Sequence, residues 1–142
     1  MIIHKVNPEN KTVELQYPSF SKMKPVVIPV RSFDDASSVV RIRTLKFISN
    51  EIRHFVKMRI YAYTQGNKMT KERQKALNHL RFIVDTYSEG SVIKLAMHIA
   101  NSRNSFAVLM PIKPSPAKTH FQNHIVPIIK YCMDLYEQSL KN

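Results

Sequence analysis

Basic or hydrogen-bonding side chains recur at every turn of one stretch of the chain, between residues 43 and 61. At about 100° per residue on a helix, the basic and hydrogen-bonding residues of this stretch fall in one arc about 100° wide, which contains no acid. They are Arg43, Lys46, Asn50, Arg53, His54, Lys57 and Tyr61. Like charges three or four residues apart cost an isolated helix a few tenths of a kcal/mol per pair, so an anionic partner would stabilise this arrangement. We therefore predict that these residues, here called the basic arc, bind an anion; the alternative is a solvated face of a chain that is basic throughout.

The net charge of the chain also favours polyanionic partners. It has 22 Lys and Arg against 10 Asp and Glu, a formal net charge of +12. Such a charge attracts nucleic acid, an acidic protein surface or an anionic membrane surface. We predict binding to the backbone phosphates of DNA or RNA, with little sequence specificity and within a larger assembly. Further cations on the next helix would extend the phosphate track: Lys71, Lys75 and Arg81.

A second apolar strip on the same stretch supports a different function. Val40, Phe47, Met58 and Ala62 fall together, beyond the basic arc and away from the main apolar stripe. If this strip is exposed, it predicts a protein–protein adaptor, a viral structural or regulatory subunit, or a homo-oligomer. If the chain's own sheet covers it, this alternative weakens. An amphipathic membrane-surface helix is less favoured, because no Trp or Leu-rich face is left for lipid.

Few residue patterns in the chain point to catalysis, a cofactor or a metal. With only 2 Gly and 1 Cys, glycine-rich nucleotide loops and cysteine zinc sites are excluded. His120 and His124 have the spacing of a metal-binding pair, but no acid lies near them in the sequence, so we predict no metal site. The spacing of Arg73 and His79 is similar to the Arg–His spacing of small helical ribonucleases. A small helical ribonuclease is the least favoured alternative. We predict a protein that is not an enzyme and needs no cofactor.

The sequence also indicates where the protein works. The N-terminal residues contain no signal-peptide apolar region, and no apolar run is long enough to span a membrane. The single Cys, Cys132, gives no disulfide framework. We predict an intracellular protein, cytoplasmic or nuclear, that is not inserted into a membrane. Abundant Lys, Asn and Ile with scarce Gly and Ala are typical of an AT-rich genome, viral (phage included) or bacterial.

The elements that would position these residues indicate an α+β fold, predominantly helical, in a single domain over 1–142. Residues 1–31 predict a β-hairpin and a third strand, and Pro25 and Pro29 place that strand at a sheet edge. The basic arc belongs to one long helix in the stretch 32–66, which Gly66 would end.

About four helices are expected, counting the long basic one. The second spans 71–87 with Thr70 as its cap, and the third runs from residue 92 to about 103. The apolar run 106–110 is expected to form a strand, and 111–117 a stiff, Pro-rich extended connector. The last helix is expected to begin at Thr119, with a kink or restart at Pro127.

Overall fold

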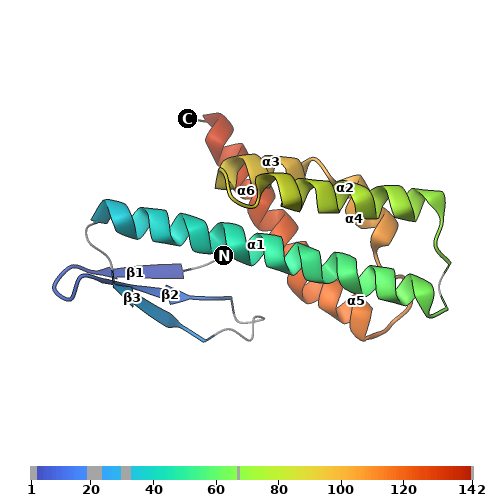
Figure 1. Cartoon of the computed structure of the whole chain (residues 1–142), viewed down its shortest axis with the longest axis horizontal. Helices are drawn as coiled ribbons and strands as arrows, with labels where there is room; N and C mark the ends of the chain where they lie inside the picture. The colour runs from blue at the N-terminus through green and yellow to red at the C-terminus, as the bar shows by residue number, and fades with distance from the viewer. Residues whose placement is uncertain (1–2, 19–23, 30–32, 67, 142) are drawn as a thin grey trace.

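Three strands and then a set of helices follow each other along the chain, which confirms a predominantly helical α+β fold with a small N-terminal antiparallel sheet. The computed structural model describes residues 3–18, 24–29, 33–66 and 68–141. The sheet lies along the N-terminal half of α1, and α2 runs beside the C-terminal half (Figure 1). In chain order the elements are β1 (Ile3–Asn7), β2 (Thr12–Gln16), β3 (Val26–Pro29), α1 (Phe33–Thr64), α2 (Lys71–Tyr87), α3 (Val92–Ala100), α4 (Arg103–Leu109), α5 (Pro116–His120), η1 (Phe121–Ile125) and α6 (Val126–Lys141).

The sheet has the simple order β1-β2-β3, with both pairs antiparallel. Val13 of β2 pairs with Val6 on one side and Ile28 on the other. Val13 and Leu15 alternate with polar neighbours and are fully buried, as expected for a strand with one face on the core. β3 contains Pro29 and lies at the edge, as predicted, because proline cannot donate to a further strand.

Helix α1 is the longest element, with 32 residues. One face carries the stripe of apolar side chains that packs into the core, and its fully or nearly fully buried members include Leu45, Ile48, Ile52, Phe55 and Val56. The helix ends at Thr64, and Gly66 follows with a φ of 144°. L side chains rarely adopt that conformation, so glycine suits the turn into α2.

The segment 106–110 is not a strand, and this part of the prediction was wrong. Most of it belongs to helix α4, which follows α3 after a short break at Asn101 and Ser102. Phe106 and Leu109 are buried and lie three residues apart, which is a helical spacing. α4 packs on α2 instead of joining the sheet.

The last helix starts earlier than predicted. α5 begins at Pro116, and the Ser115 side chain caps it by accepting from the Lys118 N–H, so the extended connector is shorter than 111–117. α5, η1 and α6 follow one another without a break. η1 is a π-helical turn in which the Val126 N–H donates to the Phe121 carbonyl, five residues earlier. The irregularity expected at Pro127 is therefore a wider turn just before it.

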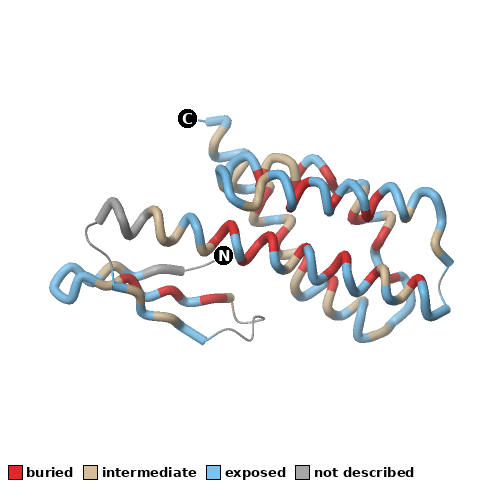
Figure 2. Tube along the Cα trace, viewed as in Figure 1, coloured by how far each residue is buried: buried red, intermediate tan, exposed pale blue. Residues whose placement is uncertain are grey.

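Buried apolar side chains from β2 and the helices form one cluster. They line the inner faces of the elements, with exposed residues on the outer faces and at the turns (Figure 2). α3 packs against α6, α2 and α1, and so lies at the centre of the helical part. Within the described part of the chain, no helix combines the length and the apolar character needed to cross a membrane.

Candidate functional site

Most of the basic arc lies on the solvent side of α1. The side chains of Lys46, Asn50, Arg53, His54, Lys57 and Tyr61 are exposed, and Arg43 is half-buried. The apolar stripe on the opposite side of the helix explains this placement, because it fixes which face α1 turns to the core. The structure thus leaves the predicted cations accessible to a partner.

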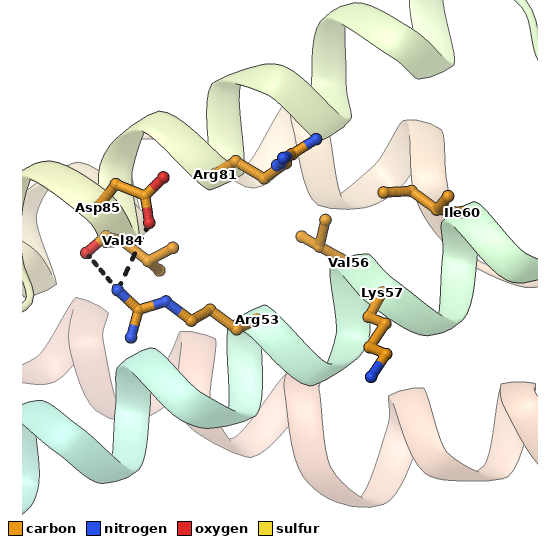
Figure 3. Close-up of a pocket in the computed structure, with 7 residues that line it drawn as sticks. All are labelled: Arg53, Val56, Lys57, Ile60, Arg81, Val84 and Asp85. Carbon is orange, nitrogen blue, oxygen red and sulfur yellow. Dashed lines mark hydrogen bonds and ion pairs between the residues drawn. The ribbon is translucent and has the colours of Figure 1, made fainter.

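Arg81 of α2 joins two of these cations around one groove. The groove between α1 and α2 has a volume of about 340 Å³. Arg53 reaches across it toward α2, and Lys57 points away from α2 (Figure 3). Its lining carries three cations and a single acid: Arg53, Val56, Lys57, Ile60, Arg81, Val84 and Asp85.

Arg53 connects the two helices at one end of the groove. Its Nη2 donates to the Val84 carbonyl, to Asp85 Oδ1 and to Ser88 Oγ, each at 3.4 Å. The side chains of Arg53 and Asp85 are 44% and 70% exposed, and an ion pair in such contact with water contributes little to stability. All the described hydrogen bonds of this guanidinium use Nη2, so Nε and Nη1 can donate to a bound anion.

The other two predicted cations of α2 lie away from this groove. Lys75 lines a separate hollow between α2 and α4, together with Glu72, His79 and Asn104. Lys71 is exposed in the first turn of α2 and does not line the groove. On a helix, Lys75 and Arg81 are about 120° apart, so they reach opposite neighbours of α2.

The apolar strip predicted as an interface is not one continuous exposed surface. Phe47 is only 4% exposed and packs on Tyr17 at the end of β2, with ring centres 5.9 Å apart. Val40 and Ala62 are half-buried, and Met58 is exposed. Phe47 is therefore covered by the chain's own sheet, which weakens the adaptor alternative.

Two exposed aromatic side chains accompany the cations. Tyr61 of the basic arc and Phe82 of α2 are each 61% exposed. Phe82 lies among polar residues of α2, on the side of the helix turned away from the core. An aromatic ring in this position can stack on a nucleic-acid base.

Arg73 and His79 do not face a common space within the chain. The Arg73 guanidinium donates to the Lys68 carbonyl and lies 4.6 Å from the Tyr63 ring centre. His79 Nε2 is 3.0 Å from Ser102 Oγ, at the start of α4. Both side chains have separate structural contacts, and the ribonuclease alternative stays a prediction without support from this geometry.

A cluster of three imidazoles and one carboxylate lies on the other flank of α1. His120 and His124 stack with ring centres 4.4 Å apart, and His54 meets His120 edge-on at 5.5 Å. Glu51 Oε2 is 3.7 Å from His124 Nδ1. Partial burial first, and then His124 and His54, lower the pKa of His120, which keeps this ring neutral near pH 7.

The sequence pattern indicated two of the three possible metal ligands in this cluster and missed the third, Glu51. It identified His120 and His124 as a possible pair but found no acid close in sequence. Glu51 precedes His120 by about 70 residues and comes from α1. Only the docking of α5 and η1 against α1 brings these residues together.

Comparisons of the chain with protein-family models, with curated proteins and with solved structures find no match. The residues of the chain itself must therefore indicate its function. Two arrangements stand out: the groove with three cations, and the histidine cluster on the opposite flank of the same helix.

Proposed function

We propose that the protein binds nucleic acid through backbone phosphates, with little sequence specificity, along the exposed face of α1 and the groove beside α2. The main support comes from cations that two helices bring to that groove. Arg53 and Lys57 come from α1 and Arg81 from α2, and Asp85 is the one acid among them. A single basic helix is common on a solvated surface, whereas cations from two neighbouring helices offer a phosphate backbone contacts on both sides of the groove.

The chemistry of these side chains fits phosphate oxygens. A guanidinium donates two parallel hydrogen bonds to a phosphate, and a lysine ammonium acts as a compact point charge. Lys46 and Asn50 continue the exposed face of α1 beyond the groove. Binding releases counterions from the nucleic acid, so affinity falls steeply with salt and depends little on base sequence.

The test is a salt titration on three groove cations. Binding of random-sequence single-stranded and duplex oligonucleotides is measured by fluorescence anisotropy between about 50 and 200 mM salt. The triple variant Arg53→Gln/Lys57→Gln/Arg81→Gln removes three phosphate contacts. Each contact contributes about 0.7 to 0.9 to the slope of log K against log salt, so the slope should become shallower by about 2 to 3.

A matched variant separates local contacts from net charge. Lys94, Lys113 and Lys141 are exposed and lie outside the groove. Their triple replacement by Gln removes the same charge, and it should leave the salt slope nearly unchanged. Equal losses in both variants would mean that binding follows net charge alone. Weak binding by the wild type would contradict the proposal and direct the search to an acidic protein partner.

A further inference from the structure

The cluster on the second flank of α1 has the composition of a metal site. One ligand atom from each of Glu51, His120 and His124 lies within 4.8 Å of the other two. All three side chains are half-buried, and each belongs to a helical segment. We propose that Glu51, His120 and His124 bind one divalent transition-metal ion of the zinc class, which links α1 to the last helix.

The donor set selects this class of metal. Two imidazole nitrogens and one carboxylate oxygen suit zinc and its neighbours in the first transition row, whereas calcium and magnesium prefer oxygen ligands alone. Tetrahedral zinc with bonds of about 2.0 to 2.1 Å holds its ligand atoms about 3.3 Å apart. The distance of 3.7 Å between Glu51 Oε2 and His124 Nδ1 is already close to that value. The three ligand atoms, now within 4.8 Å of one another, would each have to approach the others by at most about 1.5 Å.

The backbone favours convergence of the two histidines. His120 ends α5, and His124 lies within the π-helical turn η1. Their rings stack at 30° from parallel, and His124 faces Glu51. π-helical turns occur often at functional sites, and the four-residue spacing of the two histidines places both on one side of the helix.

A simple ion pair between His124 and Glu51 would explain less of the cluster. Such a pair needs one imidazole, whereas His120 and His54 also lie here, and His54 follows Glu51 by one turn of α1. Three protein ligands leave one position on tetrahedral zinc for water or a further ligand. His54 is exposed and lies against His120, with ring centres 5.5 Å apart, so it is a candidate for that further ligand.

The experiment uses the full chain without an affinity tag, after treatment with a chelator. Zinc binding is measured by calorimetry and by competition with a chromophoric chelator, and the melting temperature is followed with and without zinc. We expect one zinc per chain and a higher melting temperature when zinc is present. Loss of a residue that merely orients a ligand already costs about 10- to 100-fold in affinity, so removing a direct ligand should cost at least about 100-fold.

Conservative variants with matched controls decide the outcome. Glu51→Gln, His120→Gln and His124→Gln should each weaken zinc binding and abolish the zinc-dependent rise in melting temperature. Glu72→Gln and His79→Gln remove the same types of residue from α2 and should behave like the wild type. Absence of zinc binding by the wild type, or binding unchanged by the three cluster variants, would overturn the proposal. Neither result bears on nucleic-acid binding, which rests on other residues.

Discussion

The two flanks of α1 differ in how they would recognise a partner. Toward α2, three cations surround an open groove, and their charges act over the Debye length of about 8 Å in physiological salt. Toward α5 and η1, imidazoles and a carboxylate lie half-buried at contact distance, where recognition depends on bond geometry. Electrostatic recognition tolerates movement of a side chain by a few ångströms, whereas metal coordination does not. The second flank therefore depends far more on the exact docking of the helices.

This difference sets what each flank requires of the fold. The groove needs only that α1 and α2 present their charged faces side by side. The histidine cluster needs the last helix to keep both its position and its rotation about its own axis relative to α1. Variants that act on one flank and not on the other are the most direct tests of the contrast.

The largest expected effect concerns Cys132, which follows His124 by two turns on the same continuous helix. Burial raises the pKa of its thiol from 9.0 to about 12. At pH 8 the thiolate fraction of the folded chain is therefore about 1000-fold lower than that of an unfolded chain. Alkylation by iodoacetamide, followed by mass spectrometry, should be slower by at least that factor without denaturant. A rate close to that in denaturant would show that this helix opens and cannot hold the histidines.

The next effect separates the two flanks directly. At 0.15 M salt, the triple variant Arg53→Gln/Lys57→Gln/Arg81→Gln should bind oligonucleotides about 100-fold more weakly, because three phosphate contacts are lost. Its zinc affinity should stay within about threefold of the wild type, since no cluster residue is changed. The converse variant, His120→Gln/His124→Gln, should lose zinc and keep oligonucleotide binding. If either variant lost both zinc binding and oligonucleotide binding, the two flanks would not act independently.

A smaller effect is expected at Phe82, the exposed aromatic residue of α2. If its ring stacks on a base, Phe82→Ala should weaken binding to single-stranded oligonucleotides by about 5-fold or more, because such stacking is worth about 1 to 3 kcal/mol. Duplex binding should change little, since paired bases are already stacked. Ile112→Ala is the control, because Ile112 is also an exposed apolar residue but belongs to the segment between α4 and α5 and not to α2. An equal loss for duplex and single strands would exclude stacking by Phe82.

The smallest effect concerns the core face of α1, on which both flanks depend. Ser49 is fully buried, and its hydroxyl has no hydrogen-bond partner among the described residues. Ser49→Ala should raise the free energy of unfolding by about 1 kcal/mol, because an unpaired buried hydroxyl is costly and Ala favours the helix. Urea denaturation should show a higher midpoint with an unchanged slope. At Thr44, whose hydroxyl donates to the Val40 carbonyl at 2.8 Å, removal of the hydroxyl by Thr44→Val should give no such gain.

Sequence periodicity predicted the elements whose signals are long and local. The bounds of α2 agree with the prediction, because the Thr70 cap and a regular apolar face mark them clearly. The strand predicted at 106–110 was wrong, because a short apolar run with aromatic and β-branched residues fits a strand as well as a helix. The start at Pro116 was missed because a Ser–Pro pair can open a helix as readily as it can belong to an extended connector.

The two candidate sites also differ in how far the sequence predicts them. The basic arc could be predicted because its members recur on one helix, where angle follows from residue number. The contribution of Arg81 to the groove, and its separation from Lys75, required knowing which neighbour each edge of α2 faces. The partnership of Glu51 with His120 and His124 lies between distant segments, and periodicity carries no information about such contacts.

The π-helical turn η1 has a consequence for how the chain tolerates insertion and deletion. A π turn holds an additional residue compared with an α turn, so it sets the angular phase of everything that follows it. Deleting one residue from 121–125 would rotate α6 by about 100° relative to α5. Ile128 and Cys132, now buried, would turn toward solvent, while His120 would keep its place. η1 is thus a point where the length of the chain is tightly constrained, although it lies at the molecular surface for part of its circumference.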